Sequence, residues 1–199
     1  MPEPKVFCIG FHKTGTSTLG AALDVLGYRV GGPFGVRDHQ IAEHALDEAI
    51  TRLRRLDAVQ DNPWPLLFGD LDERYPCARF VLTVRSEDVW WASVLAHFGG
   101  VSSPMREWIY GAGRGDPEGH EAVYRERYRR HNDDVCAHFA GRGDDLLVMR
   151  LDEGDGWAEL CPFLGVDEPA APFPHANRGS PTRRAVNRWR GRLRATIGR

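Results

Sequence analysis

The chain has 199 residues, of which 42% are hydrophobic and 27% are charged, and its formal net charge at pH 7 is −2. These are ordinary values for one globular domain, and the near-neutral charge gives no global basis for binding nucleic acid or an anionic membrane. No stretch approaches the length of a membrane span, and the four cysteines are widely spaced without a C-x-x-C pair. We therefore expect a cytoplasmic protein with no membrane partner and no zinc or dithiol motif.

The first predicted elements are a strand, a tight loop and a helix. The apolar run 6–9 predicts a short strand, and Leu19 and Leu23 lie at helical spacing after the loop. Backbone N–H groups and the helix dipole make such a helix N-terminus an anion-binding site. The hydroxyl groups of Thr16, Ser17 and Thr18 add further donors for phosphate oxygens.

The position of the lysine distinguishes this loop from a nucleotide-triphosphate loop. Gly10 and Gly15 have the expected spacing, but Thr16 stands where that motif has its lysine. The lysine is instead inside the loop, at Lys13. Only Lys5 and Lys13 among the 26 basic residues are lysines, so a compact point charge occurs here in a chain that otherwise uses arginine.

Further strands and helices alternate after this loop. Asp38 is a candidate cap for a helix over residues 38–53, and another helix is expected over 64–75. Residues 79–84 form a nearly continuous apolar run, as expected for a strand covered on both faces of a parallel sheet. The alternation predicts an α/β fold, namely a three-layer, doubly wound, mostly parallel sheet with a P-loop-like phosphate-binding loop after the first strand.

The central strand leads to a second candidate anion-binding pair. Arg85 follows the strand directly and can offer a planar, bidentate fork to a phosphate. Ser93 lies eight residues later, two turns along the next predicted helix, and can add a hydroxyl group.

The second half of the chain is less regular at first. Residues 99–119 are rich in glycine and proline, and we expect a long connection that contains buried or ligand-facing aromatic residues. A long helix is predicted over 118–139, with His131 as a packing residue on its core-facing stripe. Residues 146–149 are the last clear strand.

These motifs resemble those of the PAPS-dependent sulfotransferases, in particular soluble, bacterial-type members. PAPS is 3′-phosphoadenosine 5′-phosphosulfate. The order Lys-Thr-Gly-Thr-Ser-Thr from Lys13 to Thr18 is similar to the family's 5′-phosphosulfate loop. The resemblance implies that Lys13 reaches the oxygen between phosphorus and sulfur, while Thr14, Gly15, Thr16, Ser17 and Thr18 hold the 5′-phosphate. Arg85 and Ser93 match the spacing of the family's pair on the 3′-phosphate.

A late segment matches the family less completely. Arg178 and Gly179 are placed as in the family's basic-glycine loop over the 3′-phosphate, although the fuller Arg-Lys-Gly form is absent. The resemblance implies one sulfotransferase-like domain over residues 1–180. Residues 181–199, with seven arginines, would form a basic C-terminal helix or tail.

The implied reaction is in-line transfer of a sulfuryl group from PAPS to the hydroxyl or amine of a small-molecule acceptor, which leaves adenosine 3′,5′-bisphosphate. The resemblance implies no metal, the near-neutral net charge leads us to expect no nucleic-acid partner, and the oligomeric state stays unknown. Arg85 and Ser93 would select PAPS over ATP.

No short motif identifies the catalytic base. Asp61 is the first choice because it closes a predicted strand and should lie at the carboxyl edge of the sheet, where α/β sites form. A helix cap before Pro63 is an equally good role for Asp61, and His12 and His97 are alternative bases. We expect aromatic residues to line an acceptor pocket, and the main candidates are Trp91, His97 and Trp108. The full set is Trp90, Trp91, His97, Phe98, Trp108 and Tyr110.

Two other functions remain open from the sequence alone. A P-loop nucleotide-dependent kinase would use Asp61 as a magnesium ligand, but Thr16 in the lysine position disfavours it. A non-enzymatic protein that binds nucleotide, or RNA through its arginine-rich C-terminus, would require salt-sensitive affinity.

Overall fold

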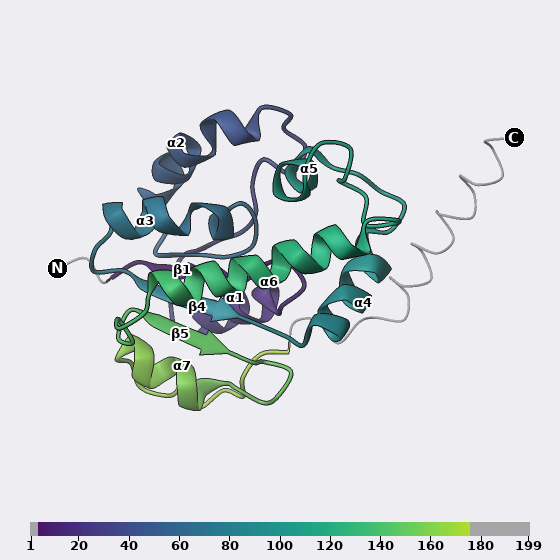
Figure 1. Cartoon of the computed structure of the whole chain (residues 1–199). Coiled ribbons are helices and arrows are strands. Elements are labelled where there is room, and N and C mark those ends of the chain that lie inside the picture. Colours follow the sequence, from purple (N-terminus) through teal and green to yellow (C-terminus); the bar gives the residue numbers. More distant parts are fainter. Residues whose placement is uncertain (1–3, 176–199) are drawn as a thin grey trace, which may run out of the picture.

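The computed structural model describes residues 4–175, and these form one five-stranded sheet with helices on both faces (Figure 1). The strand order is β2-β3-β1-β4-β5, and all pairings are parallel. The predicted α/β sheet is therefore confirmed, as an all-parallel one. The strands are β1 (Val6–Cys8), β2 (Val30–Gly31), β3 (Ala58–Val59), β4 (Arg79–Thr83) and β5 (Leu146–Met149).

The helices form the two outer layers. The helices α1 (Thr16–Val25) and α7 (Trp157–Leu164) supply the core on one face of the sheet. The other face is covered by α2 (Ile41–Leu53), α3 (Phe68–Arg74), α4 (Glu87–Phe98), α5 (Pro104–Tyr110) and α6 (Glu121–His138). None of the helices within residues 4–175 is both long and apolar enough to cross a membrane.

The buried strands explain the two separate cores. Phe7 and Ile9 point to the side of α6, while Val6 and Cys8 point to the side of α1, because side chains alternate along a strand. All four side chains are fully buried. A strand that is apolar at every position, as β1 is, therefore has to lie between two helical layers.

Three sequence predictions about elements need correction. The stretch 99–119 is not an uninterrupted connection, because it contains α5, where the Ser103 hydroxyl accepts a hydrogen bond from the Arg106 N–H (3.4 Å) and Pro104 opens the helix. Helix α2 begins at Ile41, since the Asp38 carboxylate instead accepts from the Gln40 N–H in a preceding turn (2.9 Å). The helix expected over 64–75 is a 3₁₀ turn, Trp64–Leu67, followed by α3.

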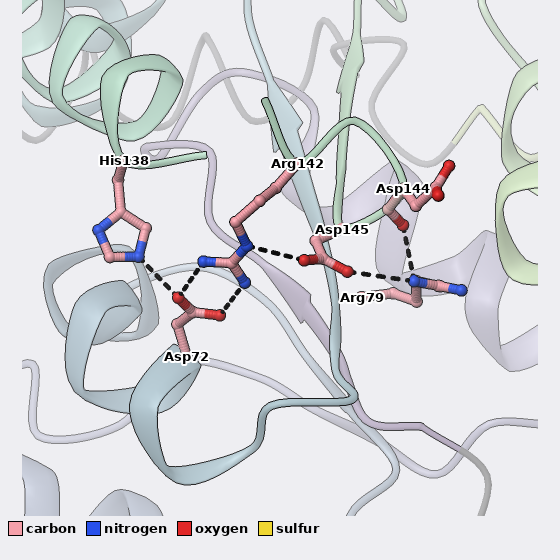
Figure 2. A network of polar contacts seen from close by, with 6 residues as sticks. All are labelled: Asp72, Arg79, His138, Arg142, Asp144 and Asp145. Carbon is pink, nitrogen blue, oxygen red and sulfur yellow. Dashed lines mark hydrogen bonds and ion pairs between the residues drawn. The ribbon is translucent and has the colours of Figure 1, made fainter. Parts of the chain in front are cut away.

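A polar network closes the end of the sheet where β4 and β5 begin (Figure 2). Both carboxylate oxygens of Asp72, on α3, accept from the Arg142 guanidinium at 2.7 Å, and His138 lies 2.7 Å from the same carboxylate. Arg142 also donates to Asp145 (2.8 Å), which in turn pairs with Arg79 of β4 (3.4 Å). The network joins α3, the end of α6 and two strands, so we assign it a structural role.

This network predicts a specific dependence of stability on pH. The hydrogen bonds from Arg142 lower the pKa of Asp72 below its usual value of 3.8, and His138 acts in the same direction. A carboxyl group with a lowered folded-state pKa stabilises the fold above its unfolded pKa, and this contribution is lost as the pH falls through the folded value. We expect Asp72→Asn to reduce the free energy of unfolding at pH 7 by about 1–3 kcal/mol. Urea unfolding of the wild type and the variant at pH 7 and pH 3 checks this. An equal loss of unfolding free energy at both pH values would contradict the prediction.

Candidate cofactor and active site

The path of the loop after β1 depends on two glycines and on the hydrogen bonds of one threonine. A Cβ at Gly10 would lie 2.5 Å from the carbonyl oxygen and 2.8 Å from the nitrogen of Thr83, so only glycine lets the loop pass the end of β4. Gly15 has a φ of 107°, which favours glycine, and precedes α1. The Thr14 hydroxyl donates to the Phe11 carbonyl (2.6 Å) and lies 2.6 Å from the Thr83 hydroxyl.

These bonds determine which groups of the loop can face an anion. The Thr14 side chain is buried, and its backbone N–H donates within the loop to Phe11 (3.3 Å). The Thr18 N–H donates to the Gly15 carbonyl (2.9 Å). The first N–H groups of a helix have no intrahelical acceptor, so Thr16 and Ser17 are the residues whose backbone best suits a phosphate. The Ser17 side chain is exposed, which also suits this role.

Lys13 and Asp61 share an uncommon backbone conformation. They are the two non-glycine residues with positive φ within residues 4–175, at 69° and 68°. A left-handed backbone at a residue with a side chain is strained, and such strain clusters at functional sites. The sequence predicted both residues as catalytic, and the structure places both at the carboxyl edge of the sheet, after the adjacent strands β1 and β3.

The carboxylate of Asp61 faces the start of α1. Its Oδ2 accepts from the Thr16 hydroxyl (3.4 Å), and its Oδ1 accepts from the Asn62 N–H (2.7 Å). Burial raises the pKa of Asp61, whereas these hydrogen bonds and the nearby charge of Lys13 oppose the rise. A carboxylate whose proton affinity is raised by burial beside a cation is suited to accept a proton.

His12 occupies the interior behind the loop. Its Nδ1 lies 2.8 Å from the Asn62 amide nitrogen, and its Nε2 lies 3.0 Å from the Tyr110 hydroxyl. An amide nitrogen can only donate, so Nδ1 accepts and Nε2 carries the proton. Burial lowers the pKa of His12 to about 3, with the charges of Arg106, Lys13 and His97 adding to the effect. The neutral ring is 2% exposed and positions its neighbours, which favours Asp61 as the base.

Arg85 contacts the loop directly. Its Nη1 donates to the Lys13 carbonyl (3.1 Å), and its Nε donates to Asp152 (3.3 Å) in the turn after β5. The backbone of Arg85 is fixed by the Tyr128 hydroxyl, which accepts from its N–H (2.9 Å) and donates to its carbonyl (3.0 Å). Ser93, two turns into α4, is partly exposed. Tyr128 and Asp152 had no motif in the sequence that could have identified them.

The aromatic residues expected around the acceptor do not line one cavity. Trp91 is buried with its ring against Tyr124 (5.9 Å between centroids), and His97 is exposed at the end of α4. Trp108 lines a cavity of about 230 Å³ between α5 and α2. Three of these aromatics contact the loop at His12. The Tyr110 hydroxyl lies 3.0 Å from its Nε2, the Trp90 indole N–H donates to its carbonyl (3.0 Å), and the Phe98 ring packs edge-on against its ring (5.1 Å between centroids). Arg178 and Gly179 lie outside the described residues.

Comparison with known proteins assigns the chain to a family. The sequence matches the family described as a sulfotransferase domain over residues 5–182. No curated protein is similar enough in sequence to provide a second comparison. The match covers most of the chain and includes the loop, Asp61, Arg85 and Ser93. This chain therefore belongs to the sulfotransferase domain family.

Proposed function

We propose that this enzyme transfers the sulfuryl group of PAPS to a hydroxyl or amine of a small-molecule acceptor. The observation that carries the proposal is the meeting of three groups from three strand ends: Lys13 after β1, Asp61 after β3 and Arg85 after β4. The start of α1 and two cations face this edge of the sheet, so the residues present fit a ligand with several phosphate groups.

PAPS supplies an activated sulfuryl group, and adenosine 3′,5′-bisphosphate remains when the bond between sulfur and the bridging phosphate oxygen breaks. Lys13 neutralises the charge that develops on that phosphate oxygen. The backbone N–H groups of Thr16 and Ser17 bind the 5′-phosphate. Asp61 takes the proton of the acceptor hydroxyl as the new oxygen–sulfur bond forms. No metal is required in this scheme.

Arg85 and Ser93 bind the 3′-phosphate and thereby distinguish PAPS from ATP. We expect Arg85→Ala to weaken binding of adenosine 3′,5′-bisphosphate about 30-fold, equivalent to about 2 kcal/mol, because a charge-assisted pair is lost. Calorimetric titration measures this affinity.

A matched variant controls for the other side-chain contact of Arg85, which is the ion pair with Asp152 (3.3 Å). Asp152→Asn removes the protein carboxylate that Arg85 contacts, and it leaves the arginine in place. We expect this variant to bind the bisphosphate at least as tightly as the wild type. Weakening of the same size in both variants would mean that bisphosphate affinity depends on the contact between Arg85 and Asp152, and it would contradict a direct bond from Arg85 to the 3′-phosphate.

Transfer itself is tested with PAPS labelled in its sulfuryl group and a pool of small hydroxyl and amine compounds. The expected result is labelled organic sulfate formed in proportion to adenosine 3′,5′-bisphosphate. Formation of neither product by folded protein, across the pool, would contradict the proposed function.

A further inference from the structure

A second feature adjoins this site, namely a cavity between α5 and α6. Figure 1 shows α5 beside the first turns of α6, and the cavity between them has a volume of about 420 Å³. Ile109, Ala122 and Val123 form its apolar walls. This volume is within the usual range for small-molecule sites. The cavity therefore suits a ligand with an apolar body.

The polar lining of the cavity is predominantly cationic. Arg114, Arg127 and Arg130 line it, and Glu126 is its one acidic lining residue. Glu126 pairs with Arg129 (3.0 Å), which is not part of the lining. Three guanidinium groups around one carboxylate that is already paired give the cavity a net positive charge.

Two of these arginines have no carboxylate partner within the described part of the chain. Arg130 pairs with Asp134 (3.6 Å), whereas neither Arg114 nor Arg127 forms an ion pair in residues 4–175. The Arg127 guanidinium lies over the Phe11 ring (5.2 Å), and burial lowers its pKa. The charge of Asp134 acts on Arg127 but forms no ion pair with it. A partly buried cation outside any ion pair gains most from an anionic ligand, because no protein partner has to be displaced.

The inner wall of the cavity is connected to the catalytic loop. Tyr110 lines the cavity and its hydroxyl lies 3.0 Å from His12, the residue before Lys13. Burial raises the pKa of Tyr110, and the negative charge of Asp61 adds to the rise, so the proposed base is within electrostatic range of the cavity wall. The wall of the cavity is thus joined to the loop by the hydrogen bond between Tyr110 and His12.

We propose that this cavity binds the acceptor and selects acceptors that carry an oxyanion, such as a carboxylate, on an apolar body. Arg114 and Arg127 hold the oxyanion, and Ile109, Val123 and the Tyr110 ring contact the apolar part. The proposal rests on the proposed sulfuryl transfer, because it identifies the bound molecule as the acceptor.

The test uses matched pairs of hydroxyl compounds that differ only in charge. The pairs are 4-hydroxyphenylacetate with 4-hydroxyphenylacetamide and 6-hydroxyhexanoate with 6-hydroxyhexanamide, titrated into the protein with saturating adenosine 3′,5′-bisphosphate. We expect at least one anion to bind about tenfold or more tightly than its amide, as a charge-assisted pair should allow. Equal affinity within both pairs would overturn the proposal.

Variants then assign the preference to the cavity. Arg127→Gln and Arg114→Gln should each remove most of the preference for the anion, while binding of the amide is unchanged. Glu126→Gln should strengthen binding of the anion, and Arg55→Gln, an exposed position after α2, controls for net charge. Anion preference that survives in both folded arginine variants would overturn the assignment.

The outcomes separate this proposal from the proposed function. The cavity variants should bind adenosine 3′,5′-bisphosphate with wild-type affinity, since no cavity residue belongs to the proposed cofactor site. Anion preference in a protein that does not bind the bisphosphate would refute the cofactor and leave a carboxylate-binding cavity. Bisphosphate binding without anion preference would refute the cavity proposal alone.

Discussion

Replacing Lys13 by alanine is expected to reduce kcat for sulfuryl transfer about 10²–10³-fold while the protein stays folded. The magnitude is that of removing one preorganised group that stabilises charge in a transition state. Binding of adenosine 3′,5′-bisphosphate should fall much less, because the backbone of α1 and Arg85 still hold the phosphates. The measurement is the rate of PAPS-dependent transfer at saturating substrates, with thermal unfolding as the check on folding.

Two further variants separate the charge of Lys13 from its backbone. Lys5 is the other lysine of the chain, and its ammonium group donates to the Leu56 carbonyl (2.5 Å), away from the loop. Lys5→Ala should therefore retain normal turnover. Lys13→Asn introduces a neutral residue that tolerates the left-handed backbone, so it should be as inactive as Lys13→Ala. Normal turnover in either Lys13 variant would exclude the role of the ammonium group.

Asp61→Asn is expected to lower kcat about 10²–10⁴-fold, the usual contribution of a positioned general base. The same variant should be as stable as the wild type at pH 7, or more stable. A carboxyl group with a raised folded-state pKa contributes stability below its unfolded pKa, and this contribution is lost as the pH rises. Because the pKa of Asp61 is raised, its charged form is unfavourable in the folded protein at pH 7. Asparagine keeps the oxygen that accepts from the Asn62 N–H.

The pH dependence of the rate tests this role independently. If Asp61 must be ionised, the wild-type rate rises with pH through a pKa that lies above the usual aspartate value of 3.8. The Asp61→Asn variant should lack this rise of the rate with pH. A full rate with an unchanged pH profile in the variant would mean that Asp61 only shapes the turn before Pro63. The helix-cap role left open by the sequence would then stand in place of the catalytic one.

The sequence could predict those parts of the site that depend on local patterns. The strand, loop and helix around Lys13 follow from hydrophobic spacing and glycine positions within about 20 residues. The proximity of Arg85 and Asp61 to the loop follows from parallel topology, because carboxyl ends of adjacent strands meet at one edge. The bond between Arg85 and the Lys13 carbonyl is the structural result of that topology.

Contacts between distant segments could not be predicted in this way. Tyr110 and His12 are 98 positions apart, and nothing in either neighbourhood indicates that their side chains meet. The direction of an aromatic side chain was equally hidden, so Trp91 and Trp108 could not be assigned to separate environments. Helix α5 was missed because its seven residues lie between glycine-rich stretches, although Ser103 and Pro104 form a typical helix start.

One calorimetric comparison tests the central claim most directly. The wild-type protein is titrated with adenosine 3′,5′-bisphosphate and, separately, with ATP and magnesium. We predict that the bisphosphate binds at least about tenfold more tightly, because we propose that Arg85 and Ser93 bind a 3′-phosphate, which ATP lacks. Preference for ATP with magnesium would favour a kinase, and binding of neither ligand would favour a non-enzymatic protein; both results would contradict PAPS-dependent sulfuryl transfer.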